Sequence, residues 1–153
     1  MMLIDTSGFF AVYSEKDKNH IPAKEAYQNS RLRITTNYIL AEYVALALIR
    51  GLPREQVLTF SAEVLTDATI EIIWVDEALH TKAVELLQAR QDKTYSLCDA
   101  VSFIPMRERG VTDALTTDKH FAQKVSFVCW NRQSHNFNTT EAPPGGEHRR
   151  GKS

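Results

Sequence analysis

Near its start the chain reads Met2-Leu3-Ile4-Asp5-Thr6-Ser7-Gly8-Phe9-Phe10, a short apolar run that ends at a carboxylate and small polar residues. The apolar run predicts a buried strand, and the residues after it suit a turn into a helix that begins near Ser7. Ligands of open α/β sheets bind just beyond the carboxyl ends of strands. Two interpretations of Asp5 therefore remain open: it caps the helix, or it belongs to a functional site.

Length and charge indicate one domain without a global electrostatic bias. The 153 residues can bury roughly two-thirds of the unfolded surface. Because 18 Lys and Arg oppose 19 Asp and Glu, binding of nucleic acid would depend on a local basic patch. Cys98 and Cys129 lack CxxC or zinc-type spacing, and we expect two small buried thiols in a reducing compartment rather than a disulfide.

The sequence contains no pattern typical of secretion or of a membrane span. Asp5 interrupts the N-terminal apolar run almost at once, so a signal peptide is not expected. No apolar run reaches the ~20 residues that are needed to cross a bilayer. We therefore expect a soluble, cytoplasmic protein with no membrane partner.

Strands and helices alternate along most of the chain. Apolar or β-branched runs predict further strands over residues 33–36, 70–75, 114–117 and 125–130. Helical patterns cover residues 8–14, 22–27, 37–50, 53–67, 76–87, 96–109 and the stretch through Phe121. The helix over residues 96–109 contains Pro105, where we expect a bend. This alternation predicts an α/β fold with a parallel sheet covered on both faces.

The pattern changes after Asn131. Residues 132–153 include Pro143-Pro144-Gly145-Gly146 and a basic end at His148-Arg149-Arg150-Gly151-Lys152. A segment of this composition cannot bury enough apolar surface to fold by itself. We therefore expect one domain over residues 1–131 and a disordered tail over residues 132–153.

Three more acidic residues stand at positions where a charge is unusual. Glu42 is the one charged residue between Tyr38 and Ile49, a segment that is apolar all round, so we expect a buried helix and a partly desolvated carboxylate. Asp99 lies in the otherwise apolar run Leu97-Cys98-Asp99-Ala100-Val101. Asp118 follows a predicted strand, as Asp5 does. Taken singly, Asp118 is explained equally well as an N-cap, and Asp99 as the partner of a neighbouring Arg or Lys. Glu42 needs a cation, a hydrogen-bonding partner or a proton.

Four such carboxylates in one small domain favour a shared cause. If they converge, two of them ~4 Å apart repel by ~4 kcal/mol at an effective dielectric constant near 20, a large share of the ~5–15 kcal/mol that stabilises a domain. A divalent cation removes this repulsion, and ligands that are all oxygen suit Mg²⁺ or Mn²⁺. Such an ion activates water and polarises a phosphoryl oxygen. The pattern therefore predicts phosphodiesterase or phosphatase chemistry.

Four fragments in order carry a resemblance to a known family: Leu3-Ile4-Asp5-Thr6-Ser7, Tyr38 to Glu42, Leu97-Cys98-Asp99-Ala100-Val101-Ser102-Phe103 and Thr116-Thr117-Asp118-Lys119-His120-Phe121. With them the chain resembles the PIN-domain ribonucleases, and within that family the VapC-like toxins of bacterial toxin–antitoxin pairs. The resemblance covers residues 1 to about 131. It implies that the catalytic, metal-binding acids are Asp5, Glu42, Asp99 and Asp118, with supporting hydroxyls on Thr116 and Thr6.

The resemblance also carries expectations about fold, activity and partners. It implies a three-layer α/β/α fold around a central, mainly parallel sheet, and cleavage of RNA by water in the presence of Mg²⁺ or Mn²⁺. It implies a homodimer whose grooves lie on a common face, and inhibition by a small antitoxin protein that blocks the site. Pro105 departs from the aliphatic residue expected in that helix, and the segment after Asn131 has no counterpart in the family.

An acidic site that binds RNA needs cations around it, because RNA is a polyanion. Lys119 and His120 are next to Asp118 and are the preferred phosphate contacts. Solvated surface is the alternative for each of them. Further candidates are Arg50, Arg54, Lys16 and Lys18.

Two other functions remain open at this point. A phosphatase of the haloacid-dehalogenase kind would use Asp5 as its nucleophile, but that family has a second Asp two residues later, where this chain has Ser7. A PIN-like binding module without catalysis is the other alternative. Retention of all four acids argues against such a module.

Overall fold

The structure of the protein is a computed structural model that describes residues 1–118 and 126–128. Its centre is a five-stranded sheet in the order β3-β2-β1-β4-β5, and all four neighbouring pairs run parallel. The first strand of the chain therefore lies in the middle of the sheet. The strands are β1 (Met2–Ile4), β2 (Arg33–Thr36), β3 (Ile70–Ile73), β4 (Asp113–Leu115) and β5 (Ser126–Val128).

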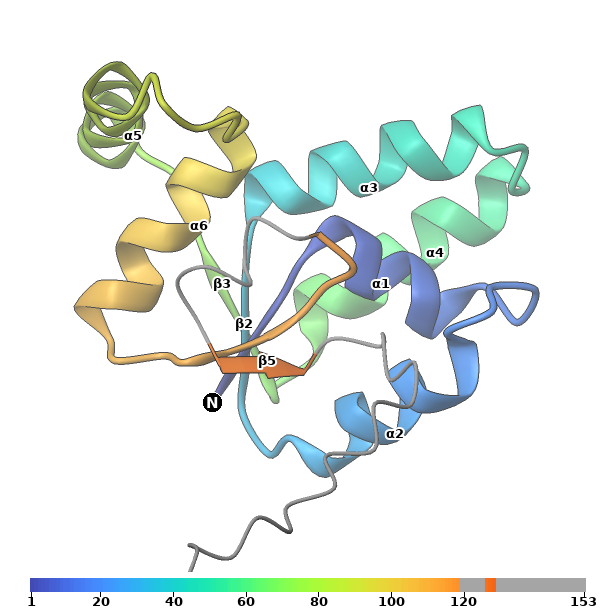
Figure 1. Ribbon diagram of the computed structural model, residues 1–153. Helices are drawn as coiled ribbons and strands as arrows, with labels where there is room; N and C mark the ends of the chain where they lie inside the picture. The colour runs from blue at the N-terminus through green and yellow to red at the C-terminus, as the bar shows by residue number, and fades with distance from the viewer. Residues whose placement is uncertain (119–125, 129–153) are drawn as a thin grey trace, which may run out of the picture.

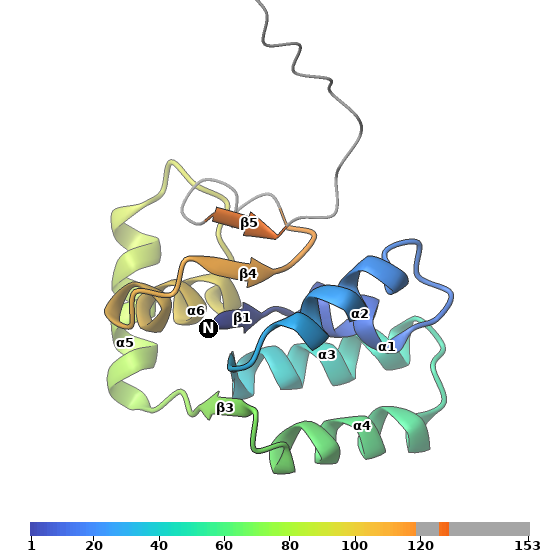
Figure 2. The same cartoon turned by 90° about the horizontal axis from the view of Figure 1, so that it is seen from below.

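Helices cover both faces of the sheet. Figures 1 and 2 show α5 (Glu77–Ala89) and α6 (Leu97–Glu108) on one side, and α1 (Thr6–Tyr13), α2 (His20–Asn29) and α4 (Arg54–Thr66) on the other. Helix α3 (Asn37–Ile49) extends from the carboxyl edge of the sheet and packs against α1 and α4. The expected three-layer α/β/α fold with a parallel sheet is confirmed.

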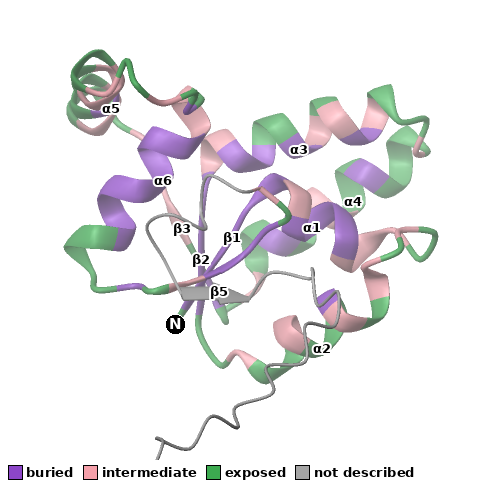
Figure 3. Cartoon of the chain, viewed as in Figure 1, coloured by how far each residue is buried: buried purple, intermediate pink, exposed green. Residues whose placement is uncertain are grey.

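Two apolar clusters hold these layers together. Phe9, Tyr43 and Phe60 pack as tilted or edge-on aromatic pairs, with ring centroids 5.2–6.1 Å apart, between the sheet and the helices α1, α3 and α4. A second cluster, around Ala83 and Val101, joins α5 to α6. Figure 3 shows α6 as the most buried helix, which explains why its sequence is apolar through Pro105 and Met106.

Helix α3 corrects one prediction. Its sequence is apolar all round, yet the structure buries only the face that carries Ile39, Leu40, Tyr43 and Ala47. The other face is open, and the side chain of Ile49 at its end is 83% exposed. The helix projects beyond the sheet edge, so one layer of neighbours is missing there. Hydrophobic composition alone could not distinguish a buried helix from one that leaves an apolar face uncovered.

Element boundaries agree with the sequence where strong local signals mark them. Strand β2 has the predicted bounds. Helices α3 and α6 end two residues before Gly51 and Gly110, whose φ angles of +79° and +62° favour glycine. Strand β3 ends before Val75, because the Val75 N–H donates to the side chain of Asn37 (2.8 Å) instead of continuing the ladder. Strand β4 spans Asp113–Leu115, so it begins one residue earlier and ends two residues earlier than the strand predicted over residues 114–117.

Some predictions fall outside the described residues. These are the helix through Phe121, the thiol of Cys129, the contacts of Lys119 and His120, and the tail over residues 132–153. The bend at Pro105 stays a prediction, although α6 does contain this residue. In the described part of the chain, no helix has both the length and the apolar character that a membrane span requires.

Candidate active site

One polar cleft lies at the carboxyl edge of the sheet. It has a volume of about 570 Å³, and its lining includes all four acids that the sequence singled out: Asp5, Glu42, Asp99 and Asp118. Asp5 and Asp118 follow β1 and β4, which are neighbours in the sheet, whereas Glu42 comes from α3 and Asp99 from the first turn of α6. The parallel sheet thus brings together residues that are far apart in the sequence.

Asp5 faces the cleft instead of capping its own helix. It stands at the N-cap position of α1, but its side chain makes no capping hydrogen bond. Its Oδ2 accepts hydrogen bonds from Thr116 Oγ1 (2.8 Å) and Ser7 Oγ (3.0 Å). The capping interpretation of Asp5 is therefore wrong.

The environment of Asp5 opposes its negative charge. The residue is 8% exposed, and this burial is the largest cause that raises its pKa from 3.8 to about 6. The hydrogen bonds from Thr116, Thr6 and Ser7 lower the pKa, while the charge of Asp99 raises it further. A cation beside Asp5 would reverse the balance and favour the ionised carboxylate.

Glu42 differs from its prediction, because it is exposed rather than partly desolvated. It lies on the open face of α3 that borders the cleft. Its Oε2 accepts a short hydrogen bond from Thr6 Oγ1. Thr6 therefore contacts two acids: its hydroxyl binds Glu42, and its backbone hydrogen bond reaches Asp5.

Asp99 is buried and also caps α6. Its carboxylate accepts a hydrogen bond from the Ser96 N–H (2.7 Å), and Ser96 Oγ accepts one from the Asp99 N–H (3.1 Å). This reciprocal pair is a capping box, for which Ser96 and Asp99 at a spacing of three are the sequence signal. This second role was not predicted. It means that Asp99 enters the cleft from a helix end whose orientation is held by two hydrogen bonds.

Thr116 connects the two acids that follow β1 and β4. The side chain is 1% exposed, and its hydroxyl donates to Asp5 while it accepts from the Asp118 N–H (2.9 Å). Ser7 makes a parallel connection, since its Oγ accepts from the Thr117 N–H (2.9 Å). The sequence predicted Thr116 as a supporting hydroxyl but assigned no role to Ser7.

The whole cleft lies within the part of the chain that matches a known family. The PIN domain family matches residues 2–125. The chain belongs to the PIN-domain family. This result excludes the haloacid-dehalogenase interpretation of Asp5, because that interpretation requires a different fold family.

Proteins similar to this chain include VapC ribonucleases. A VapC ribonuclease from Archaeoglobus fulgidus is 33% identical over 112 residues, which cover 69% of this chain and 70% of that protein. The 23S rRNA-specific endonuclease VapC20 from Mycobacterium tuberculosis is 29% identical over 123 residues, 80% of this chain and 92% of VapC20. The crystal structure of Mycobacterium tuberculosis VapC20, described as a sarcin-ricin loop cleaving toxin, superposes with a TM-score of 0.74 at 27% identity and covers 80% of this chain and 94% of that one.

The four acids of this PIN domain line one cleft, but their side chains do not converge on a single position. Across residues 1–118 and 126–128, no three His, Cys, Asp or Glu side chains are grouped closely enough to hold one metal ion. The donor chemistry nevertheless fits a hard cation, because the cleft presents carboxylate and hydroxyl oxygens.

Cys98, predicted to be a small buried thiol, contacts the acid Glu42 of the cleft. It is a free, half-buried thiol, and burial together with the charge of Glu42 raises its pKa to about 12. The thiol therefore stays protonated and shares a hydrogen bond with Glu42. A thiol in this state is a poor nucleophile.

Of the candidate RNA contacts, Arg50 has a defined position. Leu46 lines the cleft, and Arg50 follows one turn later, directly after the end of α3, with its guanidinium 4.2 Å from the ring centroid of Phe10. Arg54, Lys16 and Lys18 are exposed.

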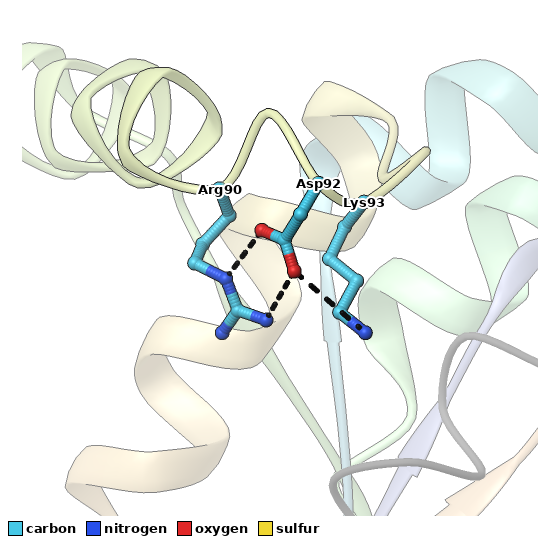
Figure 4. A network of polar contacts seen from close by, with 3 residues as sticks. All are labelled: Arg90, Asp92 and Lys93. Carbon is cyan, nitrogen blue, oxygen red and sulfur yellow. Dashed lines mark hydrogen bonds and ion pairs between the residues drawn. The ribbon is translucent and has the colours of Figure 1, made fainter.

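A carboxylate outside the cleft shows what an ordinary surface acid looks like in this protein. Asp92 lies in the loop between α5 and α6 and pairs with Arg90 (2.9 Å) and Lys93 (3.9 Å), as Figure 4 shows. The hydrogen bond and charge of Arg90 lower the pKa of Asp92, the opposite of what happens at Asp5. The two acids therefore differ in their surroundings: Asp5 is buried and its pKa is raised, whereas Asp92 is exposed beside a cation and its pKa is lowered.

Proposed function

We propose that this PIN domain is a metal-dependent endoribonuclease, the toxin component of a type II toxin–antitoxin pair, that hydrolyses RNA phosphodiester bonds with water. The observation that carries the proposal is the cleft lined by Asp5, Glu42, Asp99 and Asp118 at the carboxyl edge of a parallel sheet. The names of the VapC relatives support it, since two of them describe cleavage of RNA.

The same four acids would hold Mg²⁺ or Mn²⁺. Such an ion would lower the pKa of a water molecule, so that the nucleophilic hydroxide forms near neutral pH, and would polarise a phosphoryl oxygen. The chain's own contribution is orientation: Ser7 and Thr116 hold the Asp5 carboxylate, and Thr6 holds that of Glu42. The raised pKa of Asp5 supports the proposal, because a buried acid close to another acid is stabilised by a cation.

We further propose that cations beside the cleft bind the phosphates of the substrate. Arg50 is placed for this by its stacking on Phe10. Arg54, Lys119 and His120 are proposed as additional contacts on the basis of their charge and their position in the sequence.

The proposed partners follow from the same family. They are an RNA substrate, an antitoxin protein that covers the cleft, and a second copy of this chain. The open face of α3 supports the homodimer, because Ala41 and Ala45 are exposed there together with Ile49. A cytoplasmic location is proposed, since the RNA and the antitoxin would both be found there.

Incubation of the purified protein with total RNA in Mn²⁺ or Mg²⁺, followed by mapping of the cut ends, tests the proposed activity. We expect discrete cuts that chelation with EDTA abolishes. The variant Asp99→Asn should lose more than about 100-fold in rate, because a ligand matters at least as much as the residues that support it. The matched control is Asp92→Asn, only seven positions away but outside the cleft, which should cut like the wild type.

Two outcomes would contradict the proposal. Equal cleavage by Asp99→Asn and the wild type would mean that the activity belongs to a contaminant. A folded, antitoxin-free wild type that cuts no RNA would favour the binding module without catalysis.

A further inference from the structure

The hydroxyl of Ser7 occupies a junction between the two halves of the cleft. It donates to Asp5 Oδ2 (3.0 Å), accepts from the Thr117 N–H (2.9 Å) and lies 3.3 Å from Thr116 Oγ1. Ser7 belongs to the first turn of α1, whereas Thr117 belongs to the segment that leads from β4 to Asp118. One side chain therefore links the residue after β1 to the loop after β4.

The backbone around Gly8 makes this link possible. A Cβ atom on Gly8 would lie 2.1 Å from the carbonyl oxygen of Leu115, a distance that no side chain tolerates. Glycine thus lets the first turn of α1 rest directly on the end of β4. The Asp5 N–H also donates to the same Leu115 oxygen (3.2 Å), which holds the two segments in register.

Thr116 and Ser7 both orient the carboxyl group of Asp5. Both donate to the same oxygen of Asp5, Oδ2, and so fix the rotation of the carboxyl group and leave Oδ1 outside this pair of bonds. Their acceptor sides differ, because Thr116 takes the N–H of Asp118 and Ser7 takes that of Thr117. Together they accept hydrogen bonds from two successive backbone N–H groups, those of Thr117 and Asp118, and so hold the segment after β4 in place.

We infer that Ser7 is a positioning residue, whose hydroxyl sets the separation between the Asp5 and Asp118 carboxylates by bridging Asp5 to the Thr117 backbone. The inference rests on the proposed function, since that separation matters when both acids bind one cation. Ligands must be held within ~0.5 Å of a productive geometry, and loss of a supporting hydrogen bond costs about 10–100-fold in metal affinity.

The test compares Ser7→Ala with Ser7→Thr, which keeps the hydroxyl, and with Ser61→Ala as the matched control. Ser61 Oγ donates to the Val57 carbonyl (2.8 Å) within α4 and does not line the cleft. The primary measurement is the affinity of each protein for Mn²⁺ alone, by titration calorimetry. We expect Ser7→Ala to bind Mn²⁺ at least about tenfold more weakly, and Ser7→Thr and Ser61→Ala to bind within about threefold of the wild type.

Cleavage kinetics provide a second readout that a general loss of stability would not reproduce. For Ser7→Ala we expect kcat at limiting Mn²⁺ to fall about tenfold while KM for RNA stays unchanged, and saturating Mn²⁺ to restore most of kcat. Thermal melting without metal checks that all variants are folded.

The outcomes separate this inference from the proposed function. A wild type that binds Mn²⁺ and cuts RNA, with Ser7→Ala equal to Ser61→Ala in both measurements, overturns the inference alone. Failure of Ser7→Thr to recover affinity also overturns it, because the hydroxyl would then not be the determinant. A wild type that neither binds Mn²⁺ nor cuts RNA overturns the proposed function, and the role of Ser7 with it.

Discussion

At Asp5, the proposed function conflicts with the stability of the folded protein. Its burial beside Asp99 makes the ionised form unfavourable, and hydrogen bonds from Ser7 and Thr116 compensate only in part. An acid kept only for structure would gain from a neighbouring Lys or Arg, as Asp92 does with Arg90. Strongly shifted pKa values of this kind are common at functional sites.

The pH dependence of stability should reveal this conflict. Between its unfolded pKa of 3.8 and its folded pKa of about 6, Asp5 binds its proton more tightly in the folded protein, so the free energy of unfolding falls as the pH rises through this range. The difference corresponds to about 3 kcal/mol. In EDTA at pH 7, Asp5→Asn should therefore be more stable than the wild type by up to about 3 kcal/mol, as measured by urea unfolding.

Comparison across pH makes this prediction specific. The advantage of Asp5→Asn should vanish at pH 4 and should shrink when Mn²⁺ is added to the wild type, since a cation stabilises the ionised carboxylate. Asp92→Asn serves as the control and should gain no stability, because Arg90 already favours its charge. Parallel stability curves for wild type and Asp5→Asn from pH 4 to pH 7 would contradict the assignment.

At the scale of helices and strands, local signals determined what could be predicted. The bounds of β2 and the glycines that end α3 and α6 follow from residue types, because β-branched runs and left-handed glycines act locally. The open face of α3 does not, since the number of layers that cover a helix is a property of the whole fold. The exposure of Glu42 was mispredicted for this reason.

Contacts between helices and strands could not be predicted from the sequence either. Asp5 could be located because it follows a strand, but its partner Thr116, directly after β4, lies 111 residues away. The hydrogen bond from Thr6 to Glu42 requires α1 and α3 to lie side by side, and no pattern within either helix indicates it. The sequence thus indicated which acids meet, and the structure was needed to find the hydroxyls that hold them.

The placement of Arg50 directly after α3 leads to a prediction about substrate length. Arg50 lies eight residues beyond Glu42, about 12 Å along the helix axis. Arg50→Gln should therefore raise KM about tenfold for long RNA, with kcat little changed, because the lost contact is remote from the reacting phosphate. The slope of log affinity against log salt should become shallower by roughly 0.7 to 1, as expected for one phosphate contact.

Arg31→Gln is the matched control for Arg50→Gln. Arg31 is exposed and precedes β2, at the amino edge of the sheet, away from the cleft. It should leave KM and its salt dependence unchanged. Equal effects of the two substitutions would mean that only the net charge of the protein matters.

At the scale of the whole molecule, the parallel sheet explains why four separated acids share one cleft. Every strand of the sheet points its carboxyl end to the same edge, so residues that follow β1 and β4 meet without any long-range signal in the sequence. The same geometry sends α3 outward from that edge, with Glu42 beside the cleft and an apolar face turned away from the core. Helix α3 therefore contributes both to the acidic cleft and to the uncovered surface.

We expect this uncovered face of α3 to be the contact between two copies of the chain. Ile49 is 83% exposed. In a dimer with twofold symmetry the same residue lies on both sides of the interface, so one substitution introduces two changes into the contact. Ile49→Asp should convert a dimer of the 17.4 kDa chain into a monomer, as measured by light scattering over a range of concentrations. Ile21→Asp, on α2, alters a side chain that is 70% exposed and should leave the mass unchanged. A wild type that is monomeric at all concentrations, or a dimer that survives Ile49→Asp, would show that this face of α3 does not contact a second copy.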